Sequence, residues 1–493
     1  MMSTIKQTFQ QRIGWDANLK PFLYKKLPSN VGWSATLGSL SVALFALLTV
    51  TGMVLAMYYS PSPDKAYQSI EYIMNDVPLG KLLRGLHHWG AGAMVLVVFL
   101  HLFSVFFAGA FKAPRELTWI FGVLLLFVTL GLGFTGYLLP WDQKAYWATV
   151  VAANIPGDIP IIGESITNLI LGGKVSGFTI TRFYAIHMLV LPACMIVLIV
   201  GHIYLVRLHG MSEHKSENEP DNGKETIDNE NGRLYRFFPE HCARSALVFL
   251  VVFGIIIYLS IFSEIPKEDI VGTVDESYLP RPEWYFMWIF ELLTFFPGSS
   301  EVIGSLGIPT LCAAVLLFLP FIEKSKYIGM AKRPLATAVG ITGAIVIVYL
   351  TVTAFAGAHD YGKTLLLPDR QLTRQEETGM KIYVQQDCAY CHQVLGEGGR
   401  RVGPDISNLK AKGRTPEYLA SFVKDPQAQS RFAVMPKYDL KQEDLLALAD
   451  FMLAMDFSET RWRRISKESV VEKLKKEEGE DPGNSIEPGI VKK

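Results

Sequence analysis

Seven long apolar stretches, separated by polar segments, dominate the chain. Each is long enough to cross about 30 Å of hydrocarbon as an α-helix. The pattern therefore predicts an all-α fold, built as a transmembrane bundle of seven spanning helices. The predicted spans are 33–58, 86–108, 117–139, 184–206, 245–263, 303–322 and 336–356.

Positive charge between the spans predicts the orientation. The first 32 residues are polar and contain no short apolar run with a cleavage site, so we expect the N-terminus to stay in the cytoplasm. The cytoplasmic loops then carry 17 Lys and Arg residues and the opposite loops carry 8, in line with the positive-inside rule. Seven crossings place the C-terminal part on the outer side of the cell membrane. A formal net charge of zero argues against nucleic acid as a partner.

Polar segments divide the chain further. The Asn-, Glu- and Lys-rich run from Ser212 to Asn231 lacks apolar periodicity and separates a four-helix half from a three-helix half. A soluble segment follows the last span, and the Lys- and Glu-rich end is expected to be a solvated helix or disordered. The predicted divisions are a four-helix domain (1–211), a linker (212–240), a three-helix domain (241–357), a second linker (358–376), a soluble domain (377–457) and a charged tail (458–493).

Histidines occur in the second and fourth predicted spans and in no other span. A polar group in lipid is costly without a partner, so these histidines indicate a functional site. At about 100° per residue, His87 and His101 share one helix face, whereas His88 points nearly the opposite way. His187 and His202 differ by about 60°. Each pair spans about 21 or 22 Å along its helix, so the four side chains predict two stacked bis-histidine sites at opposite membrane depths.

A zinc site and a proton relay are competing interpretations of these histidines. Zinc needs ligands that converge on one point, and a relay usually adds intramembrane acids, which these two spans lack. Glycines at the same 14-residue interval as the first histidine pair favour a flat macrocycle between the helices, although glycines also serve close helix packing. They are Gly38 and Gly52 in the first span and Gly122 and Gly136 in the third.

The strongest local motif is Cys388-Ala-Tyr-Cys391-His392. Two thiols one helical turn apart can add to the haem vinyl groups, and the next imidazole then reaches the iron. A redox Cys-X-X-Cys pair and half of a zinc site are the alternatives, but no second cysteine pair accompanies the motif. We expect Met435 to be the sixth ligand. His/Met ligation raises the potential relative to bis-histidine ligation, which predicts a high-potential c-type haem.

Four motifs carry a resemblance to a known family. Over about residues 20–360 the chain resembles the cytochrome b of the quinol-oxidising bc family. The histidine spacings and the polar linker are similar to the b6f-type branch, in which the two halves are separate chains. The segment 377–457 resembles a small class I cytochrome c, whose haem-packing loop matches Gly403-Pro404-Asp405. The four motifs are PRELTWIFG (114–122), FTGYLLPWDQ (134–143), TRFYAIH (181–187) and RPEWYF (281–286).

The resemblance implies two non-covalent haems b and one covalent haem c. It implies that His87 and His187 ligate a low-potential haem on the outer side, and His101 and His202 a high-potential haem on the cytoplasmic side. Arginines at the helix ends are the matching propionate partners, although basic residues there also anchor helices at the interface. They are Arg84 and Arg182 on the outer side and Arg115 and Arg207 on the inner side.

The resemblance also implies a quinol site at the Pro282–Tyr285 motif. Quinol oxidation releases two protons, and Glu283 in a partly desolvated pocket can accept one. Tyr137 is its expected neighbour. A glutamate in an interfacial aromatic belt is the alternative interpretation of Glu283. In the b6f-type branch a cysteine of the first helix tethers an additional haem, and Thr36 stands at the matching position, so that thioether cannot form.

These expectations describe a quinol:cytochrome c oxidoreductase subunit. One electron passes through the two b haems to an inner quinone site, and the other passes through a Rieske iron–sulfur protein to the c haem and on to an acceptor such as a cytochrome c. The Rieske cluster must come from another subunit, because the chain contains no Rieske pattern, and the resemblance implies a homodimer. The alternatives are a di-haem membrane anchor of a quinone-reducing dehydrogenase and a non-enzymatic haem sensor or transporter.

Overall fold

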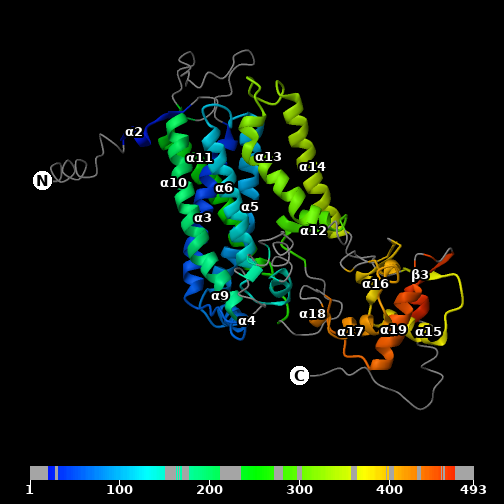
Figure 1. Ribbon diagram of the computed structural model, residues 1–493. Coiled ribbons are helices and arrows are strands. Elements are labelled where there is room, and N and C mark those ends of the chain that lie inside the picture. Colours follow the sequence, from blue (N-terminus) through cyan, green and yellow to red (C-terminus); the bar gives the residue numbers. More distant parts are fainter. Residues whose placement is uncertain are drawn as a thin grey trace. The chain divides into compact units, whose positions relative to one another are not determined.

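The computed structural model in Figure 1 divides the chain into two compact units. The first comprises residues 1–146, 165–271 and 309–347, and the second comprises 147–164, 272–308 and 348–493. Within them the structure describes residues 20–27, 32–149, 163, 165, 167–168, 177–210, 235–270, 281–296, 302–356, 364–395, 397–398, 403, 405–429, 435–456, 458 and 461–471. Most of the predicted linker 212–240 and the end of the predicted tail lie outside the described residues.

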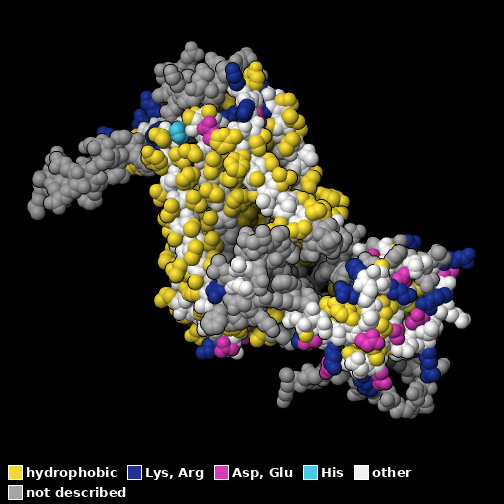
Figure 2. All heavy atoms as spheres, viewed as in Figure 1, with side chains coloured by type: hydrophobic (Ala, Val, Ile, Leu, Met, Phe, Trp, Pro, Cys, Tyr) yellow, Lys and Arg dark blue, Asp and Glu magenta, His cyan; other side chains and the backbone are white. Residues whose placement is uncertain are grey.

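Seven helices in the described part of the chain are long and apolar enough to cross a membrane, which confirms the predicted bundle. Figure 2 shows hydrophobic side chains over much of the surface of these helices, as expected for helices that face lipid. The spans are Trp33–Ala56 (η2, Trp33–Ala35, and α3, Thr36–Ala56), Gly80–Ala108 (α5), Glu116–Tyr137 (α6), Thr179–His209 (from α9, Gly177–Ala185, through η3, Ile186–Val190, to α10, Leu191–His209), Phe237–Phe262 (η4, Phe237–His241, and α11, Cys242–Phe262), Ile303–Ile322 (η7, Ile303–Gly307, and α13, Ile308–Ile322) and Pro334–Ala356 (α14).

Three spans begin at least five residues earlier than the hydrophobic pattern predicts. The second begins at Gly80, the fourth at Thr179 and the fifth at Phe237. A hydropathy pattern ends where polar side chains begin, whereas the helix continues because its backbone hydrogen bonds do not depend on side-chain polarity. The prediction that only the second and fourth spans hold histidines is therefore wrong, since the fifth span contains His241.

A π-helical turn interrupts the fourth span. It covers Ile186–Val190, directly after α9 and before Pro192 at the start of α10. A π turn inserts one extra residue into an α-helix. The 15 residues from His187 to His202 therefore turn through about the same angle as 14 α-helical residues. The offset between the two rings is then about 40°, as for His87 and His101, in place of the 60° expected for a regular α-helix.

The helices of the first unit pack in pairs. α3 packs against α5, and α6 packs against α10, while α11 contacts both α3 and α5. A short helix, α4 (Ala66–Asn75), also contacts α5. Each histidine-bearing helix therefore lies beside a helix that carries a spaced glycine pair. The apolar core between α3, α5 and α11 includes Leu40, Leu44, Leu86, Met94 and Ile256.

Polar contacts tie the ends of these helices together. The segment after α2 (Lys20–Leu23) forms strand β1 (Lys26–Leu27), which pairs antiparallel with β2 (Tyr235–Arg236) in the register Lys26↔Arg236 and Leu27↔Tyr235. Glu323, after α13, forms ion pairs of 3.0 Å with both Lys112 and Arg333, all three side chains being largely buried. Breaking a buried ion pair leaves an uncompensated charge, so this triad holds α13 and α14 against the α5–α6 turn.

The second unit contains a short apolar helix and a C-terminal domain. The former consists of η5 (Trp284–Phe286) and α12 (Met287–Leu293), which contacts η7. In the C-terminal domain α15 (Arg374–Gln385) and α17 (Pro416–Lys424) both pack against α19 (Gln442–Ala454), around a core that includes Tyr383, Leu445 and Phe451. The remaining short helices are α16 (Cys388–Cys391), η8 (Ile406–Asn408) and α18 (Pro426–Gln429).

The C-terminal domain extends beyond the limits expected from the sequence. Strand β3 (Thr364–Pro368) lies in the expected linker and pairs antiparallel with β6 (Trp462–Ser466), which lies in the expected tail. Leu365 and Leu367 are buried in the domain core. Alternating apolar residues paired across two strands bury one face, which a short charged sequence does not signal by itself. Separately, β4 (Gln393–Val394) pairs antiparallel with β5 (Glu397–Gly398).

Candidate functional site

His87 on α5 and His187 in the π-helical turn face each other across the bundle. Their ring centres are 6.3 Å apart and the ring planes differ by 70°. A metal bound to both Nε2 atoms at about 2 Å, with each ring centre about 1 Å further away, gives a separation of about 6 Å. The observed distance therefore fits a single six-coordinate iron between two axial imidazoles.

The four spaced glycines lie against the four histidine rings. A Cβ atom at Gly52 would lie 3.1 Å from His87 Cε1, and one at Gly136 would lie 2.8 Å from His187 Cε1. The corresponding distances at the other level are 3.3 Å for Gly38 and His101 and 3.3 Å for Gly122 and His202. The side chains nearest to these glycines are thus imidazole rings. From the sequence we expected the glycines to make room for a flat macrocycle. Each glycine allows a histidine of the adjacent helix to approach.

Two threonines hold the histidines of the first level. Thr51 Oγ1 is 2.9 Å from His87 Nδ1, and Thr135 Oγ1 is 3.0 Å from His187 Nδ1. The bond at Nδ1 leaves Nε2 as the ring atom available to a metal. We did not anticipate these residues from the sequence, although both immediately precede a spaced glycine, Gly52 or Gly136.

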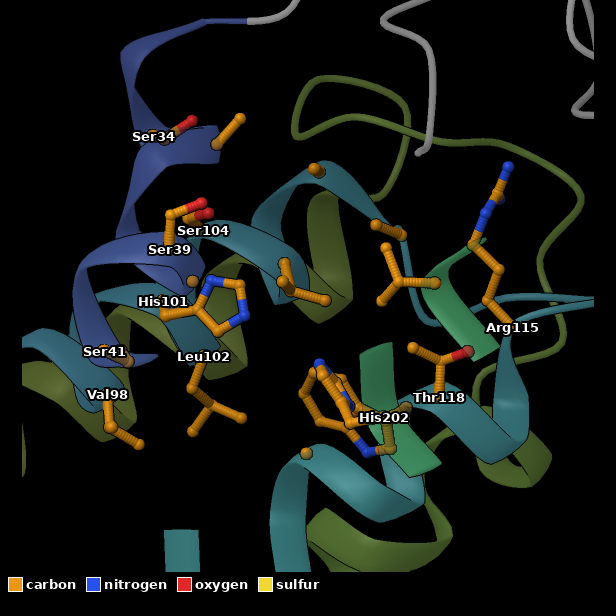
Figure 3. A pocket seen from close by; sticks show the side chains of 18 of the residues that line it. Ser34, Ser39, Ser41, Val98, His101, Leu102, Ser104, Arg115, Thr118 and His202 are labelled. Atoms are coloured by element: carbon orange, nitrogen blue, oxygen red, sulfur yellow. The ribbon is translucent and has the colours of Figure 1, made fainter. Parts of the chain in front are cut away.

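His101 and His202 line a cavity of about 1030 Å³. Figure 3 shows both rings among its lining side chains, together with Arg115 and Thr118. The glycines Gly38 and Gly122 line it as well. Its volume is that of a cofactor-sized pocket, since ligand pockets commonly measure about 300–1000 Å³.

The same cavity continues past the histidine pair to polar residues near the helix ends. His241, buried with 4% exposure, lines it and lies 3.5 Å from Ser39 Oγ through Nε2. Its ring stacks on Phe237 with centres 5.7 Å apart, and the Arg207 guanidinium lies 4.2 Å from the Phe237 ring centre. Sequence reasoning missed His241 because the apolar pattern starts after it.

The four arginines differ in their surroundings. Arg115 and Arg207 both line the cavity, and Arg115 Nε donates to the Gly210 carbonyl over 3.4 Å. Arg84 is buried and donates to the Pro266 carbonyl at 2.8 Å. Arg182 is exposed and donates to the Asn168 carbonyl at 3.2 Å. Of the four arginines, Arg115 and Arg207 are therefore the pair that the structure places beside a cofactor-sized cavity.

The Cys-X-X-Cys-His motif forms the short helix α16 and the residue after it. His392 N donates to the Cys388 carbonyl at 3.0 Å, and Gly403 N donates to the Cys391 carbonyl at 3.1 Å. A Cβ at Gly403 would lie 2.4 Å from His392 Cε1, so only glycine allows this approach. Met435 packs against the core cluster that contains Cys388. Pro404 of the expected haem-packing loop lies outside the described residues.

The aromatic ring of Tyr383 lies close to the two cysteines. Its side chain is buried, and this burial, with the nearby Cys388 thiol, raises the pKa of its phenol well above the ordinary value. The phenol therefore stays neutral at physiological pH. The ring packs on Phe451 with centres 5.3 Å apart.

Glu283 and Tyr137 belong to different units, and each is described within its own. Glu283 is half-buried and directly precedes η5, and its backbone carbonyl accepts a hydrogen bond of 2.8 Å from Phe286 N. Tyr137 ends α6, where its ring meets Phe134 edge-on at 5.5 Å. Thr36 is buried, and its hydroxyl donates to the Trp33 carbonyl at 2.7 Å.

Family models match three parts of the chain. Residues 22–210 match the model described as cytochrome b/b6/petB, and residues 280–367 match cytochrome b(C-terminal)/b6/petD. Residues 374–452 match the model of cytochrome c oxidase, cbb3-type, subunit III.

Individual relatives agree with these models. A cytochrome bc complex cytochrome b subunit of Chlorobaculum thiosulfatiphilum is 33% identical over 328 residues, which cover 66% of this chain and 73% of the relative. A cytochrome b6 of Heliobacterium mobile is 44% identical over 178 residues, covering 36% of this chain and 84% of the relative. Among solved structures, a chain of a hyperthermophilic respiratory Complex III matches with a TM-score of 0.63 and 29% identity, covering 71% of this chain and 91% of that chain.

Fold and motifs together define a multi-pass membrane protein of electron transport that carries a cytochrome c domain. The chain belongs to the cytochrome b family of bc-type complexes. Membership in this family implies haem b, and the C-terminal domain implies haem c.

Proposed function

We propose that this chain is the cytochrome b and c subunit of a quinol:cytochrome c oxidoreductase. The observation that carries the proposal is the pair of histidine levels, with His87 facing His187 at 6.3 Å and His101 and His202 lining one cavity. Haem b supplies one-electron transfer at each level. Two such centres at different depths carry electrons from one side of the membrane to the other.

Quinol oxidation takes place at the outer side in this proposal. Glu283 accepts a proton from the quinol and releases it to the outer aqueous phase, and the family resemblance alone assigns Tyr137 to quinol oxidation. A general base needs a position within hydrogen-bond reach of the reacting proton. The half-buried side chain of Glu283 supports this assignment, because it is partly withdrawn from water and still accessible. His87 and His187 would hold the haem b on this side, which would supply one-electron chemistry for the second electron once a Rieske protein has taken the first.

Quinone reduction takes place at the inner side. The cavity beyond His101 and His202 is polar at the side of Arg207 and His241, which suits a quinone carbonyl and its protons. Arg115 and Arg207 bind the propionates of the inner haem, and Arg84 and Arg182 those of the outer haem. The N-terminus lies in the cytoplasm, and the cytochrome c domain lies outside it, in line with the positive loops.

The C-terminal domain continues the second electron path. Cys388 and Cys391 would attach a haem c, and His392 and Met435 would bind its iron. The domain receives electrons from the Rieske protein and passes them to an acceptor such as a cytochrome c. The complex is a homodimer, in keeping with its family.

The haem content of the purified protein tests this proposal. We expect a pyridine haemochrome measurement to give two haems b for each haem c. A protein with only haem c would favour a non-enzymatic sensor or transporter. A protein with the expected ratio that reduces quinone but fails to oxidise quinol, even with its Rieske partner, would favour the membrane anchor of a dehydrogenase.

Replacing Met435 by leucine is expected to lower the reduction potential of haem c while the covalent attachment remains. The thioether bonds depend on Cys388 and Cys391, whereas thioether ligation of the iron raises the potential. Potentiometry with mass measurement of the haem-bearing chain checks both points. Met380, which also packs on the domain core, provides the control variant Met380→Leu. An unchanged potential in Met435→Leu removes Met435 from the ligand set.

A further inference from the structure

The hydroxyl proton of Thr51 determines which way its bond to His87 runs. Thr51 Oγ1 lies 2.9 Å from the Leu47 carbonyl and 2.9 Å from His87 Nδ1. A buried threonine in a helix donates its single proton to the carbonyl four residues earlier. The oxygen is then an acceptor toward the ring, so His87 Nδ1–H donates to Thr51. This fixes the tautomer that leaves Nε2 unprotonated.

Thr135 repeats this arrangement on α6. Its Oγ1 lies 2.8 Å from the Gly131 carbonyl and 3.0 Å from His187 Nδ1. The two threonines thus act from α3 and α6 on the two histidines of one level. Both threonine side chains are buried, with exposures of 2% for Thr51 and 5% for Thr135.

The other histidine level lacks this feature. In the described part of the chain, neither His101 Nδ1 nor His202 Nδ1 has a side-chain hydrogen-bond partner. The residues before Gly38 and Gly122 are Leu37 and Phe121, where the first level has threonines. Glycine thus occurs at both histidine levels, 14 residues apart on each helix. The residue that precedes the glycine is threonine at the first level and leucine or phenylalanine at the second.

We propose that Thr51 and Thr135 are positioning residues that lower the reduction potential of the outer haem relative to the inner haem. The inference rests on the haem ligation proposed above. A hydrogen bond accepted from Nδ1–H makes the imidazole a more basic ligand. A more basic axial ligand stabilises ferric iron over ferrous iron, which lowers the potential. The difference drives electrons from the His87–His187 level to the His101–His202 level.

Potentiometry of the b haems in the purified holoprotein tests the proposal. We expect Thr51→Val and Thr135→Val each to raise the lower of the two b potentials and to leave the higher one in place. Each substitution should change the ferric–ferrous equilibrium by about tenfold or less, equal to about 59 mV or less for one electron. Thr51→Ser keeps the hydroxyl and should keep the potential.

A matched control lies on the same helix. Thr49 donates to the Phe45 carbonyl at 2.8 Å, and the variant Thr49→Val removes an equivalent helix bond two residues from Thr51. It should leave both potentials unchanged. The converse variant, Leu37→Thr, places a hydroxyl in front of Gly38 and should lower the higher potential.

The outcomes separate this inference from the ligation on which it rests. A wild-type protein without two haems b refutes the ligation. Two haems b whose potentials do not move in Thr51→Val and Thr135→Val, or move equally, refute the role of the threonines. If the valine variants lose their outer haem, the potential of the Leu37→Thr variant tests the proposal instead. An unchanged higher potential in Leu37→Thr overturns the proposal.

Discussion

Replacing Glu283 by glutamine is expected to remove most quinol oxidation while all three haems stay bound. Glutamine has nearly the same shape but cannot accept a proton at physiological pH, and general-base catalysis contributes about 100-fold or more. The measurement is quinol-dependent reduction of haem c in the complex with its Rieske partner, alongside the haem ratio. We expect turnover to fall by about 100-fold with the ratio unchanged.

Glu291 provides the control for this variant. It lies on α12, in the same apolar segment as Glu283 but about two helical turns further on. Glu291→Gln should retain turnover. If Glu283→Gln oxidises quinol at the wild-type rate, Glu283 has no part in the mechanism, and the interfacial-belt interpretation of this residue stands.

Replacing Gly136 by valine is expected to eliminate the outer haem b. The first carbon of any side chain at this position would lie 2.8 Å from His187 Cε1, closer than van der Waals contact permits. The ring must move, and this breaks both its alignment with His87 and its bond to Thr135. The haemochrome ratio should fall from two haems b per haem c to one, with the remaining haem b at the higher potential.

Gly131 is the matched control for Gly136. It lies on the same helix, and a Cβ there would be 3.6 Å from Leu191 Cδ1, an ordinary contact. Gly131→Ala should therefore retain both haems b. An unchanged ratio in Gly136→Val would mean that α6 yields without displacing His187, and the requirement for glycine at this position would have to be abandoned.

In the C-terminal domain the haem-attachment motif was predictable from local sequence, and the strand pairing was not. Five adjacent residues, 388–392, indicate haem attachment because thiol spacing and the next imidazole are matters of local chain geometry. The β3–β6 pairing was not predictable in this way. It joins Leu365 to Ile465, residues 100 positions apart, and only the folded core brings them together.

In the helical bundle, too, some features follow from the sequence and others do not. The length of the apolar stretches predicts the number of spans, and helical periodicity places His87 and His101 on one face. These properties depend on residues close in the sequence, so the sequence alone determines them. It could not reveal the π turn that brings His187 into line, because a single extra residue leaves no compositional trace.

The surroundings of each histidine were decided by tertiary structure. The glycine pairs were visible as a 14-residue repeat, yet only the packing of α3 on α5 and of α6 on α10 shows that each glycine meets an imidazole ring. The threonine bonds arise from the same contacts, and His241 is buried beside Ser39 of α3. Sequence periodicity determines which face of a helix a side chain occupies. Packing between helices decides what that side chain touches, and therefore its proton, its neighbours and its chemistry.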